Sequence, residues 1–380
     1  MEPFKNEISP ALVGLIGRLL ARHAPGTDIS AFEAATLPQL NRLELKQRVT
    51  LIADVMHDLL PRDPETRRSV LLAMLHPDEE GHANASSTDD GLCGWGIWPL
   101  TTVVGRHGLG SLEQSLETLR EMTKRGTSEF DVRPFIAAHP ARALAVIGSW
   151  VTDQNVHVRR LVSEGTRPRL PWGMRLHALI EDPSALLPIL AELRDDPAEY
   201  VRRSVANHLN DIAKDHPDLV ARIAADWMEG ADKTRVRLLR HACRTLIKQG
   251  HSGALATFGI HSPQIAKPEI RIATPTVLLG NALTFDVNLR STNPAEQRLI
   301  IDYVIHHRKA NGTLSPKVFK WTTMTLAPGQ ALNLTRHHKM KPITTRSYHA
   351  GEHLLALRIN GKDFGEECFA LEMPAGLSRS

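Results

Sequence analysis

Apolar side chains recur every three or four residues along roughly the first two thirds of the chain. Residues 11–20, 43–60 and 64–75 each show this spacing, which is typical of amphipathic helices that bury one face. Residues 78–90 break the pattern with acidic, glycine and serine residues and are expected to form a loop. The pattern therefore predicts an all-helical N-terminal region.

From Leu112 onward the helical pattern repeats along the chain. A valine–arginine pair begins each of four apolar-periodic segments, at residues 132, 158, 201 and 236. In the clearest of them Asp196 is placed to cap a helix and Pro197 to occupy its first position. Paired helices at such irregular intervals resemble degenerate HEAT repeats, which stack into a curved solenoid.

A different pattern begins near Ile260, where apolar and polar residues mostly alternate with a period of two. Seven short segments of this kind lie between residues 269 and 373, and turn signals such as Asn311-Gly312 and Asn360-Gly361 separate them. They predict seven strands of an immunoglobulin-like β-sandwich without its usual disulfide. The predicted fold class is mainly α, with a HEAT-like helical-repeat solenoid in residues 1–261 followed by a C-terminal immunoglobulin-like β-sandwich in residues 262–380.

Two further stretches of the helical region raise the question of a bound ligand. Trp95 and Trp98 could stack on a ligand, but burial between repeats is the favoured interpretation because large aromatic side chains mostly serve cores. The run GRHGLG at residues 105–110 has no preceding strand. It is therefore expected to form a turn and not a phosphate-binding loop.

Composition narrows the classes of function. The three cysteines lie far apart and the 19 histidines show no metal-site spacing, so neither a disulfide framework nor a metal or other cofactor is expected. No apolar run is long enough to span a bilayer, and the first residues lack the pattern of a secretion signal. These features indicate a protein of a reducing, intracellular compartment that acts away from membranes.

The net charge of +4 is unevenly distributed. Residues 1–90 hold 9 lysines and arginines against 14 aspartates and glutamates (−5), whereas residues 262–380 hold 15 against 9 (+6). The middle part, residues 91–261, is closer to balance with 22 against 19 (+3). The modest basic excess of the middle and C-terminal parts favours a polyanionic partner there.

The stretch SEGTRPRLPW at residues 163–172 combines a helix end with a stiff, basic loop. Gly165 is expected to end the incoming helix in a left-handed conformation, and the two prolines then restrict the backbone. The segment is expected to expose both of its arginines and, at its tip, Trp172. A proline-rich connector between two repeats is the alternative interpretation, and spacing alone does not decide between them.

Acidic side chains recur on the two helices beside this loop. Glu164 shares a helix face with Arg160, and Asp211 shares one with Arg203. Equivalent helices of a solenoid line the same wall, so Glu164 and Asp211 are expected to converge near Trp172, with the arginines keeping both acids ionised. The alternative is that each column is an ordinary solvated helix face.

The run at residues 163–172, together with SEFDVRPF at residues 128–135, resembles the AlkC branch of the AlkD-related DNA alkylation repair glycosylases. The resemblance covers nearly the whole chain, including the C-terminal sandwich. It implies a HEAT-like glycosylase that excises cationic N3-alkylated bases, 3-methyladenine and 3-methylcytosine, without flipping the base into a pocket. The implied partner is double-stranded DNA containing alkylated bases, bound by a monomer in the cytoplasm and nucleoid of a bacterial-type cell.

The resemblance also implies roles for individual residues. The family's catalytic acids and its stacking aromatic correspond to Glu129, Glu164, Asp211 and Trp172. For Glu129 the alternative is an acid in the first turn of a helix, favoured by the helix dipole. The catalytic tryptophan–aspartate pattern of the shorter relatives is echoed only loosely, by Trp150 and Asp153.

Basic side chains near the acids and on the sandwich are expected to hold phosphates. The residues expected to contact DNA are Arg160, Arg167, Arg169, Arg203, Arg308, Lys309 and Lys341. The last three belong to the basic C-terminal part, which is therefore expected to be a DNA-contacting arm. The opposing hypothesis for the whole chain is a non-catalytic HEAT-repeat scaffold that binds protein partners.

Overall fold

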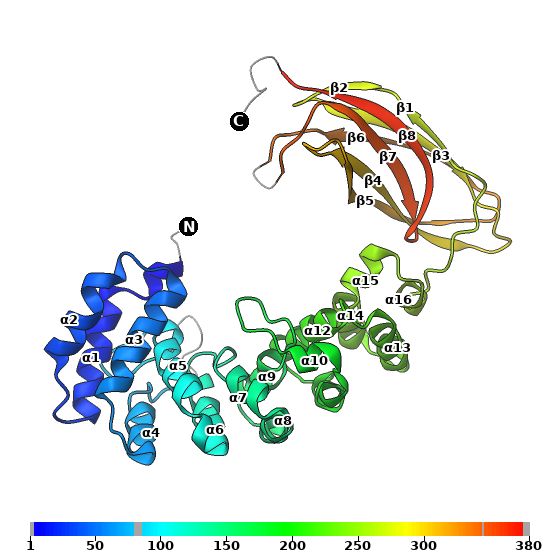
Figure 1. Ribbon diagram of the computed structural model, residues 1–380. Coiled ribbons are helices and arrows are strands. Elements are labelled where there is room, and N and C mark those ends of the chain that lie inside the picture. The colour runs from blue at the N-terminus through cyan, green and yellow to red at the C-terminus, as the bar shows by residue number, and fades with distance from the viewer. Residues whose placement is uncertain (1–3, 80–85, 344–345, 375–380) are drawn as a thin grey trace. The chain divides into compact units, whose positions relative to one another are not determined.

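The computed structural model describes residues 4–79, 86–343 and 346–374. The chain forms two compact units, Met1–Asp215 with Asp232–Ala242, and His216–Ala231 with Cys243–Ser380. Figure 1 shows helices from the blue N-terminal part into green, and strands from yellow to red. Secondary structure changes from helix to strand between Thr257 and Glu269. The predicted fold class is confirmed, and the domain division after residue 261 stays a prediction because the compact units group the last helices with the strands.

The first unit is built of short helices that pack in pairs, some adjacent in the chain, such as α1 on α2, and others separated by one or two helices, such as α3 on α5, α9 on α12 and α12 on α14. Its α-helices are α1 (Pro10–His23), α2 (Ile29–Leu40), α3 (Leu45–Leu59), α4 (Pro64–Ala73), α5 (Ile97–His107), α6 (Leu112–Thr123), α7 (Arg133–Ala138), α8 (Pro140–Gly148), α9 (Val156–Gly165), α10 (His177–Glu181), α11 (Leu187–Leu193), α12 (Glu199–Ile212) and α14 (Lys233–Ala242). Its 3-10 helices are η1 (Phe4–Glu7), η2 (Gly94–Gly96), η3 (Leu109–Ser111), η4 (Ser149–Thr152) and η5 (Ser184–Leu186).

Local sequence explains where several of these helices begin. Side chains just before the helix accept a hydrogen bond from a first-turn amide at Ser9, Asp28, Asp63 and Asn155. Each such cap satisfies an amide that has no partner within its own helix. Because the apolar positions then follow the helical period, one face of each longer helix is buried.

Two local predictions for this unit are wrong. The strongest repeat helix begins at Glu199 and leaves Pro197 outside. The Asp196 carboxylate accepts from Ala198 N at 2.8 Å, ahead of the helix, and pairs with Arg159 at 2.6 Å. Gly105 does not start a turn but lies inside α5, where an added Cβ would come within 2.9 Å of Asp131. Glycine is needed there because two segments approach closely.

The second unit joins three helices to a sandwich of two sheets. Its helices are α13 (Pro217–Met228), α15 (Arg244–Gln249) and α16 (Ser252–Thr257), and its strands are β1 (Glu269–Ile272), β2 (Thr276–Leu278), β3 (Ala282–Arg290), β4 (Gln297–Arg308), β5 (Leu314–Leu326), β6 (Ala331–Lys339), β7 (Gly351–Ile359) and β8 (Lys362–Glu372). The strand orders are β1-β3-β6 and β2-β8-β7-β4-β5. Neighbouring strands are antiparallel except β2 and β8, which run parallel.

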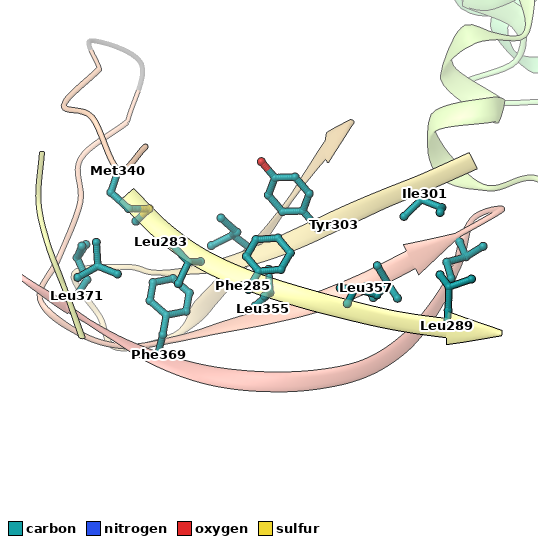
Figure 2. Close-up of a cluster of buried hydrophobic side chains, with 14 of the residues drawn as sticks. Leu283, Phe285, Leu289, Ile301, Tyr303, Met340, Leu355, Leu357, Phe369 and Leu371 are labelled. Atoms are coloured by element: carbon teal, nitrogen blue, oxygen red, sulfur yellow. The ribbon is translucent and has the colours of Figure 1, made fainter. Parts of the chain in front are cut away.

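Alternate side chains of the two sheets fill the core of the sandwich (Figure 2), including Leu283 and Phe285 of β3, Tyr303 of β4, and Leu355 and Leu357 of β7. The period-two pattern therefore predicted the core face correctly. The seven predicted strands are present, and β2 is an eighth that the pattern missed because it spans three residues. The predicted turns Asn311-Gly312 and Asn360-Gly361 connect β4 to β5 and β7 to β8, with a positive φ at both glycines.

Candidate functional site

Gly165 ends α9 and begins the proline loop, residues 166–174. The helix end was predicted correctly, but the predicted left-handed conformation is wrong, because Gly165 is not among the residues with positive φ. A Cβ at this position would come within 2.7 Å of the Val132 side chain. Glycine therefore allows the close packing of α9 against the segment that carries Glu129.

Arg167 is buried, although the sequence predicted that the loop would expose it. Its side chain donates to Glu164 Oε1 at 2.5 Å and to Asp211 Oδ2 at 2.8 Å, and only 6% of the residue is exposed. The guanidinium thus joins the two acids that were expected to converge. A fork of N–H donors suits this task because it can serve two carboxylates at once.

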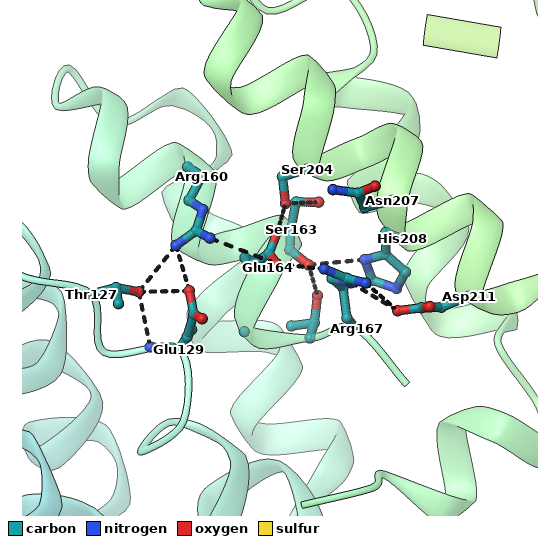
Figure 3. Close-up of polar contacts among 12 residues, drawn as sticks. Thr127, Glu129, Arg160, Ser163, Glu164, Arg167, Ser204, Asn207, His208 and Asp211 are labelled. Carbon is teal, nitrogen blue, oxygen red and sulfur yellow. Dashed lines mark hydrogen bonds and ion pairs between the residues drawn. The ribbon is translucent and has the colours of Figure 1, made fainter. Parts of the chain in front are cut away.

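Glu164 lies at the centre of the polar contacts in Figure 3. Its second oxygen accepts a hydrogen bond from the Ser204 hydroxyl at 2.5 Å, and Arg160 lies 3.6 Å from its first. Burial would raise the pKa of Glu164, but Arg160, Arg167 and Ser204 together hold that pKa below its ordinary value. The carboxylate is therefore ionised at neutral pH despite being buried.

Glu129 joins the same cluster through Arg160. The Arg160 guanidinium donates to Glu129 Oε2 at 2.5 Å and also to Thr127 Oγ1 at 3.1 Å. It lies over the ring of Tyr200, 5.2 Å from the centroid. Glu129 is not a first-turn acid, because the next helix, α7, begins at Arg133. Glu129 and Glu164 therefore lie beside one another in the structure, and Arg160 bridges them.

Asp211 lies at the inner end of this cluster. It is 2% exposed and accepts a hydrogen bond from Lys214 at 2.8 Å in addition to its pairing with Arg167. Glu129 and Glu164 belong to the wall of a cavity, but Asp211 is not among the described residues that line it. Asp211 is therefore connected to the cavity through Arg167, which pairs with it and lines the wall.

Trp172 is the exposed tip of the proline loop, as predicted. It is 56% exposed, and its φ of 64° is unusual for a residue other than glycine. The ammonium group of Lys46 donates a hydrogen bond to its main-chain carbonyl. A large aromatic side chain left exposed on a strained backbone is a candidate for ligand contact.

The cavity has a volume of about 690 Å³, and Trp172 lines it together with Glu129, Glu164 and Arg167. Its lining also includes four further aromatic side chains, Phe4, Trp95, Trp98 and Phe130. The Trp98 and Phe130 rings stack with centroids 5.0 Å apart, and the Trp95 ring follows 6.1 Å from Trp98. The cavity thus combines acidic side chains with aromatic faces.

The favoured interpretation of Trp95 and Trp98 as buried between repeats is wrong. Both side chains are only partly buried, and both line the cavity. The sequence offered one signal, which was the spacing of three residues between the two tryptophans. Glycines flank Trp95, and the stretch forms the short 3-10 helix η2. That signal could not distinguish a cavity wall from a core.

Trp150 and Asp153 lie away from the cavity. The Trp150 indole is buried and donates to Glu117 at 3.0 Å, while Asp153 pairs with Arg120. Neither residue lines the cavity within the described part of the chain. Their place in the structure is that of a packing contact between α6 and η4.

Two of the arginines expected to bind DNA lie on the surface of the first unit. Arg169 follows the buried part of the proline loop and pairs with Asp215 at 2.7 Å. Arg203 is exposed on α12 and pairs with Glu199 at 3.0 Å. The exposed Arg203 pair is weak, so its guanidinium remains accessible to a phosphate. Arg169 is half-buried and holds Asp215 with two hydrogen bonds of 2.7 Å, so it is only partly accessible.

The other three expected contacts belong to the sandwich. Arg308 is the last residue of β4 and is partly buried, whereas Lys309 in the following hairpin is exposed. Lys341 is exposed two residues beyond the end of β6. Residues 337–339, which precede Lys341 closely, belong to strand β6.

Sequence reasoning missed two buried residues beside the acids. His208 donates from Nδ1 to the Ser163 carbonyl at 2.9 Å, and burial and nearby Arg167 lower its pKa to about 3. Arg133 is fully buried beneath the proline loop. Arg133 was visible within the run at residues 128–135, but nothing in the residue type indicates a buried cation.

No group of three or more potential metal ligands occurs in residues 4–79, 86–343 and 346–374. Over the same residues, no helix has both the length and the hydropathy required to cross a bilayer.

Comparison with known proteins places the chain in a family. The family model "Uncharacterised protein YhaZ, C-terminal Ig-like domain" matches residues 266–373. The chain is 40% identical over 260 residues to the uncharacterized protein YhaZ of Bacillus subtilis (strain 168), which covers 68% of this chain and 72% of YhaZ. The solved structure of Pseudomonas fluorescens alkylpurine DNA glycosylase AlkC, bound to DNA containing an abasic site analog, superposes with a TM-score of 0.81 and 32% identity, over 98% of this chain and 100% of that one. The chain therefore belongs to the AlkC branch of the AlkD-related DNA alkylation repair family.

Proposed function

We propose that this protein is a DNA glycosylase that hydrolyses the N-glycosidic bond of cationic N3-alkylated bases, 3-methyladenine and 3-methylcytosine, in duplex DNA. The observation that carries the proposal is the pair of arginine-bound acids, Glu129 and Glu164, on one cavity wall with the exposed Trp172. The likeness to a DNA-bound alkylpurine glycosylase over the whole chain supports the same reaction class.

The reaction needs stabilisation of the sugar more than activation of the base. An N3-alkylated base carries a positive charge, so it leaves as a neutral molecule when the bond to C1′ breaks and the electron pair departs with it. The sugar then resembles an oxocarbenium ion, which a nearby carboxylate stabilises electrostatically. Water adds to C1′ and loses a proton, and Glu164 or Glu129 can position that water and accept the proton.

Glu164 is our choice for the principal acid. Its pKa lies below the ordinary value, so it is a carboxylate throughout the neutral range and can face a developing positive charge. Both of its oxygens are held by neighbouring donors. The group therefore does not have to reorganise when charge develops on the sugar. Asp211 supports it by fixing the second side of Arg167.

We expect the Trp172 indole to pack against the deoxyribose. The face of an aromatic ring attracts a cation, and the attraction grows when water is excluded. The remaining rings of the cavity, Phe4, Trp95, Trp98 and Phe130, extend this apolar surface. In this scheme the protein contacts the sugar of the damaged nucleotide, and the base is not inserted into a closed pocket.

The accessible arginines and lysines are proposed to hold the DNA backbone. Arg169 and Arg203 serve the helical unit, and the sandwich contributes Arg308, Lys309 and Lys341 as a DNA-contacting arm, in line with the charge of +6 over residues 262–380. Such contacts position the duplex without reading its sequence. We propose that the protein acts as a monomer on chromosomal DNA in the bacterial cytoplasm.

The direct test is incubation of the purified protein with methylated duplex DNA, followed by chromatography of the released bases. Free 3-methyladenine or 3-methylcytosine and matching abasic sites are expected, with no added metal or nucleotide. Undiminished release in the presence of a chelator is the expected control result. No base release would support the opposing hypothesis of a helical-repeat protein scaffold.

A further inference from the structure

Arg133 is a buried cation whose guanidinium donates hydrogen bonds to main-chain carbonyls. Among the residues that the structure describes it is the largest fully buried side chain, with 0% exposure. Nη1 donates to the carbonyls of Gly165 and Arg167, both at 2.8 Å, and Nε donates to the carbonyl of Met174 at 2.8 Å. No carboxylate of the described residues forms an ion pair with it.

The three carbonyls lie at the two ends of the proline loop. Gly165 is the last residue of α9, and Arg167 follows it, whereas Met174 comes two residues after Trp172. A single guanidinium in α7 therefore ties the entrance of the loop to its exit. The loop also closes on itself through Leu176 N and the Pro168 carbonyl, 3.2 Å apart.

The contacts continue to both functional parts of the site. Gly173 packs so closely on Arg133 that an added Cβ would lie 3.1 Å from Nε, which fixes the residue next to Trp172. At the entrance, Arg133 holds the carbonyl of Arg167, whose side chain orders Glu164 and Asp211.

A planar fork is required for this arrangement. Nη1 donates to the two carbonyls at the entrance of the loop, and Nε donates to the Met174 carbonyl at its exit. A planar guanidinium presents donors on separate nitrogens in this way, whereas an ammonium has only one nitrogen. Burial and the nearby charge of Arg167 lower the pKa of Arg133 to about 10, so it stays charged at neutral pH. Burying such a charge without an ion pair is unfavourable. Packing alone therefore does not explain why an arginine occupies this position.

We propose that Arg133 is a positioning residue for base excision, which holds the proline loop so that Trp172 and Glu164 address the same sugar. The inference rests on the proposed glycosylase function. It assigns Arg133 no contact with DNA, and its effect passes through the loop. Misplacing a group by about 1 Å can lower a rate by about 10²-fold.

The test is a double-mutant cycle of Arg133→Lys and Trp172→Ala, with single-turnover excision and DNA affinity measured separately. Arg133→Lys keeps the charge and loses the fork. We expect it to slow excision by about tenfold or more in the parent protein, with the Kd for abasic-site DNA changed by less than about threefold. In the Trp172→Ala background the same substitution is expected to slow excision by less than about threefold.

Arg67→Met is the matched control. Arg67 also donates to main-chain carbonyls, those of Pro61 and Arg62, but it lies in α4 away from the cavity. Its substitution is expected to leave excision unchanged. Amide hydrogen exchange of residues 166–176 should accelerate in Arg133→Lys and stay unchanged in Arg67→Met, and this readout does not require activity.

Several results would overturn the inference. Equal slowing by Arg133→Lys in both backgrounds would show that it does not act through Trp172, and unchanged loop exchange would show that it does not hold the loop. If Arg133→Lys does not fold, Gly173→Ala replaces it in the cycle and in the exchange measurement, because its methyl presses on the same guanidinium. An inactive parent protein would instead contradict the proposed function, while the exchange result would still decide the role of Arg133.

Discussion

The helical unit buries charged side chains beside one another, whereas the core of the sandwich buries neutral histidines. In the helical unit, Glu164 and Arg167 stay charged because each is paired with oppositely charged groups. In the sandwich, His307 and His353 are equally buried, but ring nitrogens of both have no hydrogen-bond partner in the described part of the chain. Burial, with nearby cationic groups, lowers the pKa of His307 to about 3 and also lowers that of His353. The sandwich therefore keeps these groups neutral.

This difference distinguishes a functional arrangement from a packing arrangement. A buried charge is unfavourable unless its partners are held in good geometry. The helical unit maintains a row of such pairs from Glu129 to Asp211 beside an open cavity. The sandwich instead packs neutral histidines against aromatic rings, such as His307 against Phe319 and Tyr348. Electrostatic chemistry is therefore expected from the first unit and not from the sandwich core.

Replacement of Arg167 should have the largest effect on stability among the substitutions considered. Arg167→Met removes the shared partner of Glu164 and Asp211 and should lower the free energy of unfolding by about 3–5 kcal/mol. His307→Leu is the matched variant in the sandwich, and it should change that free energy by less than about 1.5 kcal/mol. Denaturant unfolding at pH 7 measures both. Similar losses in the two variants would contradict the distinction drawn here.

Trp172 separates function from stability within the helical unit. Trp172→Ala should slow excision by about tenfold, the rate equivalent of a cation–aromatic contact worth 1–2 kcal/mol. Its melting temperature should stay nearly unchanged because the side chain is exposed. A core role would instead lower stability by about 3–5 kcal/mol. Leu109→Ala, another exposed apolar residue, serves as the control for both assays.

The surface charges of the sandwich should act on DNA binding alone. Neutral substitutions of Arg308, Lys309 and Lys341 should weaken DNA affinity and lower the slope of log K against log salt by about 1 per lost contact. Arg358→Gln is the control, since Arg358 is already paired with Asp363 at 2.5 Å. Titrations at several salt concentrations test this. An unchanged slope in the triple variant would mean that the sandwich is no DNA-contacting arm.

Asp131 tests, within the helical unit, whether ion pairing decides if a buried carboxyl group stays charged. Like Glu164 it is a buried carboxyl group, but it has only threonine hydroxyls beside it, and burial raises its pKa to about 7 from 3.8. The raised pKa means that Asp131 supports stability below pH 3.8 and that this support is lost as the pH rises to about 7.

Asp131→Asn should therefore stabilise the protein at pH 8, by at least about 1 kcal/mol or ~2–4 °C in Tm. The gain should shrink at pH 5, where the native carboxyl is protonated in the fold. Thermal melts of both proteins at the two pH values measure it. A Tm difference that is the same at pH 5 and pH 8 would show that Asp131 does not titrate as described.

Regular features of the protein could be predicted because they depend on local sequence. The hairpins at Asn311-Gly312 and Asn360-Gly361 follow from residue types whose backbone preferences act over a few positions. The alternating strands likewise follow from a period that any six to nine residues display. The predicted grouping of Glu164 with Asp211 came from helical spacing together with the family resemblance.

The remaining features depend on contacts between distant residues. Arg167 was expected in solvent because arginine usually is exposed, and its burial depends on Asp211, which lies 44 positions away. The position of Trp98 on a cavity wall depends on Phe130, and the short strand β2 forms only because β8 runs beside it. No local pattern carries that information.

The central claim is that Glu164 acts as a charge in the transition state, and its removal tests this most directly. Single-turnover excision of 3-methyladenine and the Kd for abasic-site DNA would be measured for the parent protein, Glu164→Gln and Glu113→Gln, in which an exposed pair with Arg142 is removed as a control. We expect Glu164→Gln to reduce the excision rate by about 10²-fold or more with little change in Kd, and the control to match the parent protein. Equal excision rates for Glu164→Gln and the parent protein would contradict the account.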